Sequence, residues 1–192
     1  MMGSFALGVM SGCAVAALTA SFGWADALLR PALTAVRATP VASFIILALV
    51  WMSSGTVPVF AGALMALPIV WANITHGIDT VDNGLLEMAT TYRFGRWKTV
   101  RHVILPSIRG TFIAACGASI GLCWKAMIAA EVLGTPARSI GTQLYSAKIY
   151  LQTDEMFAWT LLIILLSRGQ EMAFRAITQR TEKKEVGSGY PG

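Results

Sequence analysis

The sequence predicts an all-α membrane protein with about five transmembrane helices, and three observations support this fold class. Of the 192 residues, 55% are hydrophobic and only 13% are charged, whereas about a quarter of the residues in a soluble domain are charged. The mean hydropathy is +0.62, and the apolar residues gather in segments near the roughly 20 residues that span a bilayer core. The basic residues collect in alternate connections between these segments. We therefore expect one membrane domain over residues 1–180 and a disordered tail over 181–192.

Five hydrophobic segments are candidates for the membrane-spanning helices. They run from Phe5 to Trp24, Val41 to Met52, Thr56 to Ile74, Thr111 to Leu133 and Met156 to Ala176. The second segment is short, and the fifth loses its apolar character after Leu166. No basic stretch precedes the apolar residues at the N-terminus, so we expect the first segment to stay in the protein rather than be cleaved as a signal peptide.

The positions of the basic residues predict how these segments are oriented. Alternate crossings would place 12 of the 15 lysines and arginines on one side of the membrane: Arg30, Arg37, Arg93, Arg96, Lys98, Arg101, Arg109, Arg168, Arg175, Arg180, Lys183 and Lys184. Only Arg138 and Lys148 would lie on the other side. Because cytoplasmic connections are enriched in Lys and Arg, we expect an outside N-terminus and a cytoplasmic C-terminus. The net charge of +5 therefore indicates membrane orientation, and we expect no nucleic-acid partner.

Two of the segments contain small residues four positions apart. Gly8 and Gly12 form such a pair in the first segment, and Gly117 and Gly121 form one in the fourth. Small residues let helix backbones approach closely in lipid. This pattern is compatible with packing inside the chain and with an interface between subunits, and the sequence leaves both open.

The connection between the third and fourth segments, about residues 76–109, is long and polar. A loop of this length without secondary structure would be unusual. Leu85, Leu86, Met88, Ala89 and Tyr92 fit the apolar face of a helix that Asp82 or Asn83 could cap. Trp97, Val100 and Ile104 suggest a second helix, which we expect to end at Leu105-Pro106, because a residue before proline is disfavoured in helical conformation. Periodicity alone fits equally a membrane-surface helix and a docking element for a cytoplasmic protein.

A resemblance to a known family favours the docking element. Glu87-Met88-Ala89, Arg96-Trp97 and Ile104-Leu105-Pro106 resemble the "EAA" loop of ABC importer permeases. In that family the loop forms a coupling helix that sits in a groove of the ATPase subunit. The resemblance therefore implies that ATPase coupling involves Glu87, Met88, Ala89, Tyr92, Arg93, Gly95, Arg96, Leu105 and Pro106. Arg93 stands where the family has its glycine, and Gly95 is expected to mark the bend after the helix.

The resemblance covers most of the chain, about Phe5 to Arg180. Residues 37–44, 121–134 and 151–159 look like the nitrate, sulfonate, taurine and bicarbonate branch of these permeases. The family fold is the type I importer core, which works as a dimer. Members of the branch have a further N-terminal helix, and this sequence begins near their second one. We expect either a truncated product or a minimal five-helix form.

The resemblance implies the function of a permease subunit in a prokaryotic inner membrane. A second permease copy, two ATPase subunits, a solute-binding protein and membrane lipid are the implied partners. The cargo would be a small nutrient, anionic or containing nitrogen or sulfur, or a vitamin precursor. No G-x-x-x-x-G-K-[ST] motif occurs in the sequence, so ATP and Mg²⁺ would be bound by the ATPase. Alternatives are a secondary transporter, for which no internal repeat is found, and a membrane scaffold without transport activity.

The fourth segment contains two charged residues, Lys125 and Glu131. A charge near the bilayer centre costs about 2.5–3.5 kcal/mol, so such residues face a cavity or a partner. Lys125, preceded by Trp124, could line a translocation path and attract an anionic substrate, or could tether a neighbouring helix. For Glu131, nearer the segment end, we favour a structural role or a position near the docking surface of the binding protein. The three cysteines lie in apolar stretches without metal-ligand spacing.

Overall fold

The computed structural model describes residues 2–188, and this part of the chain is all-helical, as predicted. The elements are α1 (Met2–Ser21), α2 (Gly23–Ala38), α3 (Val41–Trp51), α4 (Val57–Asp79), α5 (Asn83–Thr91), α6 (Arg96–Thr99), the π-helix η1 (Val100–Ile104), α7 (Leu105–Gly134), α8 (Ile140–Ile149) and α9 (Thr153–Ser188). Helix α9 thus continues into the tail that the sequence predicts to be disordered, and residues 189–192 lie outside the described range.

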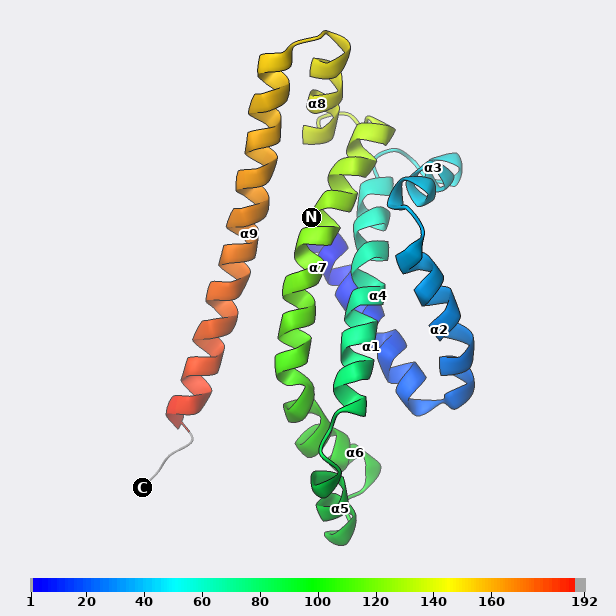
Figure 1. The fold of residues 1–192 in the computed structure, drawn as a ribbon, viewed down its shortest axis with the longest axis vertical. Coiled ribbons are helices and arrows are strands. Elements are labelled where there is room, and N and C mark those ends of the chain that lie inside the picture. The colour runs from blue at the N-terminus through cyan, green and yellow to red at the C-terminus, as the bar shows by residue number, and fades with distance from the viewer. Residues whose placement is uncertain (1, 189–192) are drawn as a thin grey trace.

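Helices α4 and α7 lie side by side along the long axis of the molecule, and α1 crosses behind them (Figure 1). Helices α2 and α3 lie on one side of this centre and α9 stands on the other. The 76–109 loop, with α5 and α6, forms one end of the molecule, and α8 lies at the opposite end. The loop is therefore remote from the α8 end.

Three stretches of the described chain are long and apolar enough to cross a membrane: Met2–Ser21, Val57–Asp79 and Trp97–Gly134. Helices α2 and α3 provide a fourth crossing if the pair is counted as one span bent by 104°. By length and composition these account for three or four of the five predicted crossings. The predicted fifth segment lies in α9, where Arg168, Gln170 and Glu171 interrupt the apolar run.

The connection that carries Arg30 and Arg37 is itself a helix. Helix α1 ends at Ser21, Phe22 is extended with φ −132° and ψ 112°, and α2 begins at Gly23. Helix α2 buries Ala25 and Leu33 and leaves Arg30 and Arg37 exposed. Its amphipathic pattern therefore fits a helix that lies against the bundle, whereas the sequence analysis treats this region as a simple connection.

The centre of the bundle is built where α1, α4 and α7 converge around Gly62. A Cβ atom at Gly62 would lie 2.8 Å from Met127 Cγ, 2.9 Å from Cys123 Sγ and 3.1 Å from Ser4 Oγ. The fully buried Ser4 hydroxyl donates to Met127 Sδ at 2.9 Å. On the other side of α4, Trp71 Nε1 donates to Thr19 Oγ1 at 3.1 Å, tying α4 to the end of α1. These contacts make α1, α4 and α7 one packed unit.

Candidate functional site

The 76–109 loop begins with a capped helix, α5, docked on the base of the bundle. Asp82 is the N-cap, and its Oδ1 accepts a hydrogen bond from the Gly84 N–H at 2.8 Å, as the sequence predicts. Ala89 is only 1% exposed and packs with Val81 and Val103, and Leu86 and Ile108 border this cluster. The cluster joins α5 to the end of α4 and to the helix that leads into α7.

The opposite side of this loop presents apolar side chains to the surroundings. Tyr92 is 71% exposed and Trp97 76% exposed, and Leu85, Met88 and Phe94 are exposed as well. Phe94 stacks edge-on with His102, with ring centroids 6.5 Å apart. Exposed aromatic rings on a short helical element are typical of an interaction surface. Phe94 and Trp97 thus lie on one surface with Met88 and Tyr92, which the resemblance assigned to ATPase coupling.

Helix α5 ends in a Schellman turn whose left-handed residue is Arg93. The Arg93 N–H donates to Thr90 O at 3.0 Å, and the Phe94 N–H donates to Ala89 O at 2.8 Å. Arg93 has a φ of 52°, a conformation that costs a non-glycine residue roughly 1–2 kcal/mol. Gly95 lies in the connection between α5 and α6, as expected, but it does not have a positive φ. The bend is at Arg93, where the family has its glycine.

The second helix of the loop does not stop at Leu105-Pro106. Helices α6, η1 and α7 follow one another without a break from Arg96 to Gly134, and Pro106 lies in the first turn of α7. The expected end is wrong because η1 changes the hydrogen-bond register: the Leu105 N–H pairs with Val100 O, five residues back. A π-turn of this kind accommodates a residue that cannot donate. Leu105 and Pro106 are both exposed.

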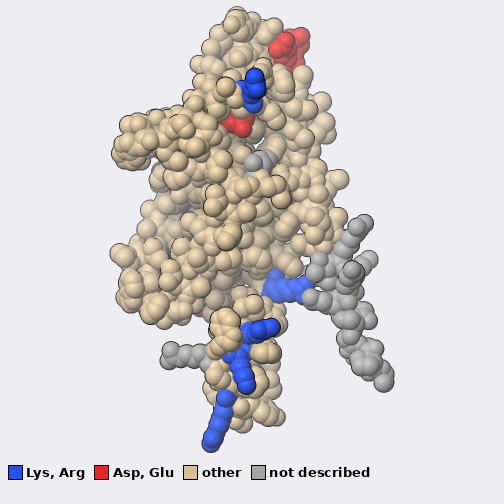
Figure 2. Space-filling view, turned by 180° about the vertical axis from the view of Figure 1, so that it is seen from behind, with Lys and Arg blue, Asp and Glu red and all other residues tan. Residues whose placement is uncertain are grey.

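The loop end of the molecule is rich in exposed positive charge. Arg93, Lys98 and Arg101 are exposed and make no ion pair with the described side chains, and the Arg96 side chain lies outside the described part. Figure 2 shows basic side chains gathered over this end, whereas the acidic side chains seen on this face lie toward the opposite end. The Glu87 carboxylate is exposed, and its carbonyl oxygen accepts from the hydroxyls of Thr90 and Thr91. The surface is therefore apolar and mainly basic.

The structure does not bring Lys125 and Glu131 together. The Glu131 carboxylate accepts from the Gly141 N–H at 2.9 Å, so it sits at the N-terminus of α8 and joins this helix to α7. A Cβ at Gly141 would overlap Glu131 and lie 2.8 Å from Val132 N, which is why the joint needs glycine. Lys125 is exposed and makes no ion pair with the described side chains. Trp124 is buried, and its Nε1–H has no hydrogen-bond partner among the described residues.

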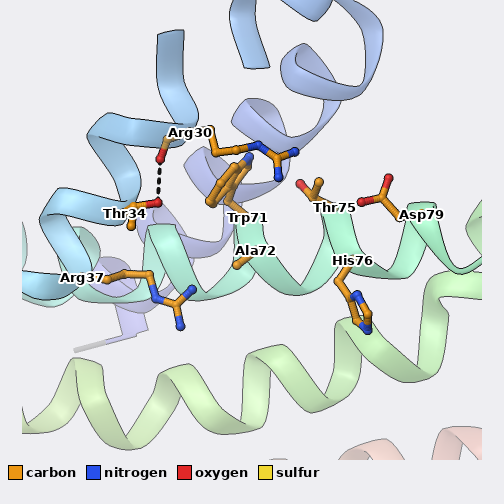
Figure 3. Close-up of a pocket in the computed structure, with 8 residues that line it drawn as sticks. All are labelled: Arg30, Thr34, Arg37, Trp71, Ala72, Thr75, His76 and Asp79. Atoms are coloured by element: carbon orange, nitrogen blue, oxygen red, sulfur yellow. Dashed lines mark hydrogen bonds between the residues drawn. The ribbon is translucent and has the colours of Figure 1, made fainter. Parts of the chain in front are cut away.

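A cleft between α2 and α4 lies near the loop end (Figure 3). It encloses about 320 Å³ and is lined by Arg30, Thr34, Arg37, Trp71, Ala72, Thr75, His76 and Asp79. Arg30 Nη2 lies 3.0 Å from Asp26 Oδ1, so its charge is already paired. Asp79 adds a carboxylate to the lining. The cleft therefore mixes both signs of charge, and we assign it no ligand.

The fold and the loop define the class of protein, and comparison with known proteins agrees. A solved structure described as an amino acid ABC transporter with histidines superposes with a TM-score of 0.74 at 20% identity, over 95% of this chain and 87% of that one. The fold is thus that of a type I ABC importer core. Residues 5–181 match the family of binding-protein-dependent transport system inner membrane components, and the chain belongs to this family.

Relatives of known name agree with the branch that the sequence resembles. SsuC of Escherichia coli, named as a putative aliphatic sulfonates transport permease protein, is 30% identical over 76% of this chain. SsuC of Bacillus subtilis, which has the same name, is 24% identical over 93% of this chain. The chain spans 55% and 65% of the lengths of these two relatives.

Proposed function

We propose that this chain is the membrane-spanning permease subunit of an ATP-driven importer. The observation that supports this most directly is the 76–109 loop, which holds an exposed apolar and basic surface on a helix packed against the membrane helices. A pair of ATPase subunits would dock on this surface and would bind ATP and Mg²⁺. A solute-binding protein would deliver cargo at the opposite end of the molecule.

The contacts of α5 suggest how movement of an ATPase would reach the membrane helices. Ala89 packs on Val81, at the end of α4, and on Val103, in the helical stretch that continues into α7. A shift of α5 would therefore displace α4 and α7, two of the most extensively packed helices of the bundle, at the same time. Rigid helices packed in this way transmit a displacement rather than absorb it.

The orientation follows from the same surface. If the loop faces the ATPases, α4 ends and α7 begins in the cytoplasm, which places the α8 end outside. Arg93, Lys98 and Arg101 then lie on the cytoplasmic side, in agreement with the enrichment of basic residues there. An outside N-terminus and a cytoplasmic C-terminus complete this topology.

A second copy of the chain would complete the translocation path. On α7, a Cβ added at Gly121 would meet open space, and one added at Gly117 would have one distant neighbour, Phe174, at 3.9 Å. Lys125 follows Gly121 by four residues and so lies on the same face of the helix. An ammonium group in a membrane segment needs water or a partner. These features support a homodimer in which the Lys125 faces of both copies border an aqueous path.

The position of Lys125 favours an anionic cargo. The exposed Lys125 ammonium, which forms no ion pair within the described part of the chain, attracts negative charge. The buried Nε1–H of the adjacent Trp124 is a further donor that no described residue accepts. The relatives named for aliphatic sulfonates would fit such a path. We therefore propose a small anionic nutrient or vitamin precursor, containing nitrogen or sulfur, as the transported class.

Purification of the tagged full chain from its own membranes in mild detergent tests this function. The expected result is an ATPase subunit recovered near 1:1, with ATPase activity in the complex, and loss of that subunit when Glu87 is changed to Lys. Glu155→Lys, on the first turn of α9 at the α8 end, is the matched control and should retain the ATPase. A chain that purifies alone in several detergents, without ATPase activity, would instead support a transporter independent of ATP.

A further inference from the structure

Arg93 combines a costly backbone conformation with a side chain that is exposed to the surroundings. Its φ is 52°, and a glycine would adopt this conformation without steric cost. Its guanidinium is exposed and makes no ion pair or hydrogen bond with the described side chains. A residue in a strained backbone conformation whose side chain makes no stabilising contact within the protein is a candidate for contact with another molecule.

The conformation alone does not distinguish Arg93, because Thr135, Arg138 and Leu151 also have positive φ. Its surroundings do. In the sequence Arg93 stands between Tyr92 and Phe94, whose exposed rings contact each other with centroids 6.5 Å apart, on the loop that also exposes Lys98 and Arg101. A cation among cations and aromatic rings is well placed to meet a partner with the opposite charge.

We propose that Arg93 is a docking residue that pairs with a carboxylate on the rim of the ATPase groove that receives α5. This inference rests on the proposed function. The guanidinium offers a planar fork of donors that fits a carboxylate with two hydrogen bonds. Lys98 and Arg101 strengthen the attraction of the loop for an acidic rim. The exposed rings of Tyr92 and Trp97 would enter the apolar part of the groove.

Arg93 would determine which ATPase binds to the loop, whereas the apolar rings would allow an ATPase to bind at all. An ATPase with a neutral or basic rim would still contact the apolar rings but would lack the pair with Arg93, and like charges across an interface are unfavourable. Arg93 would therefore select one ATPase among several similar ones. The main competing occupant of the surface is an anionic lipid headgroup, which basic segments at a membrane surface also attract.

The test uses the full chain purified together with its own ATPase, and compares Arg93→Gly, Arg93→Glu and Arg138→Gly. Arg138→Gly is the matched control, because Arg138 is an exposed arginine with φ 61° in the loop before α8. Both glycine variants should unfold at the same temperature as the wild type or higher. Arg93→Gly should weaken ATPase retention about tenfold and flatten its dependence on NaCl, since removal of one partner of a charged pair costs at least this much. Arg138→Gly should change neither.

Arg93→Glu should lower retention further, and replacing the facing groove carboxylate of the ATPase by Arg should restore it. If wild type and Arg93→Gly retain the ATPase equally and with equal salt dependence, the role of Arg93 is overturned. The proposed function would stand in that case, because the wild-type chain would still bind its ATPase. The role of Arg93 is likewise overturned if Arg93→Gly weakens only the binding of vesicles that contain phosphatidylglycerol, since the occupant would then be lipid. A wild-type chain that retains no ATPase would overturn the proposed function itself.

Discussion

Helices α1 and α7 contain the same spacing of small residues but use it in opposite ways. In α1, Gly8 and Gly12 are buried against α4: a Cβ at Gly8 would lie 2.6 Å from Ala66 Cβ, and one at Gly12 would lie 2.8 Å from Val70 Cβ. In α7, Gly121 has nothing within 4 Å of that position. The pattern therefore marks a face that permits close approach, and the rest of the fold determines what approaches it.

The physical reason is the arrangement of neighbours. Helix α4 lies between α1 and α7 in the packed unit, and its residues Ala63, Ala66 and Leu67 fill the space over the α1 glycines. At Gly117 the corresponding face of α7 looks toward α9, and a groove of about 380 Å³ lies between the two helices there. Substitution of a glycine that is covered by α4 should therefore lower the stability of the fold. Substitution of an uncovered glycine on α7 should instead affect the association of two copies.

The largest effect is expected for Gly8→Ala. The added methyl would lie 2.9 Å from the carbonyl oxygen of Ala63, which is backbone and can move only with its helix. Overpacking of this kind costs about 1–3 kcal/mol, so thermal unfolding of the purified chain in detergent should shift clearly downward. Gly121→Ala is the matched control and should leave the melting temperature unchanged. Similar melting temperatures for the two variants would remove the distinction between the two faces.

Gly121→Leu should break assembly without breaking the fold. The larger side chain has room in the isolated chain but would separate two copies that meet on this face. We expect an unchanged melting temperature and a dimer dissociation constant raised about tenfold or more, measured by single-molecule photobleaching in lipid. An intact dimer with Leu at this position would place the second copy elsewhere.

Lys125→Met keeps the length of the side chain and removes its charge on the same face of α7. Uptake of an anionic cargo by vesicles containing the complete transporter should lose about tenfold in apparent affinity, the effect of one charge-assisted contact. Lys148→Met, in the last turn of α8, should transport normally. Unchanged uptake by the Lys125 variant would remove this residue from the path.

The smallest effect is expected for Ser4→Ala, on the covered side. The change removes a buried hydroxyl that donates to Met127 Sδ at 2.9 Å but leaves the packing volume nearly intact. Neutral hydrogen bonds contribute about 0.5–1.5 kcal/mol, and one to sulfur belongs at the low end. Urea titration of the detergent-solubilised chain would show the difference as a small shift in midpoint. A loss as large as that for Gly8→Ala would mean that this hydroxyl organises the contact of the three helices.

Much of the candidate site follows from local sequence. Asp82 caps α5 because a short acceptor precedes a helical run. The spacing placed Ala89 on one apolar face with Leu85, Met88 and Tyr92, but packing against Val81 and Val103 buries Ala89 alone of these four. The turn at Arg93 could not be found in this way, since arginine has no preference for a left-handed conformation. Only the family resemblance, in which glycine stands at this position, indicated a left-handed residue here. The nearby Gly95 led the sequence analysis to place the bend two residues later.

The continuous helix through Pro106 could also not be predicted from the local sequence. A residue before proline disfavours helical conformation, yet the π-turn η1 lets Leu105 bond to Val100 and allows the helix to continue. Helix α8 and its attachment through Glu131 and Gly141 likewise depend on a contact between residues ten positions apart.

The sequence by itself determined the helical class, the membrane environment and the amphipathic loop, because hydropathy and periodicity are properties of neighbouring residues. The tertiary structure decided how α2 and α3 bend by 104°, which glycines are covered, and that Glu131 joins helices while Lys125 stays exposed. These outcomes depend on which helices become neighbours in space. They are determined by how closely segments that are far apart in the sequence pack against one another, and the local sequence pattern does not specify this packing.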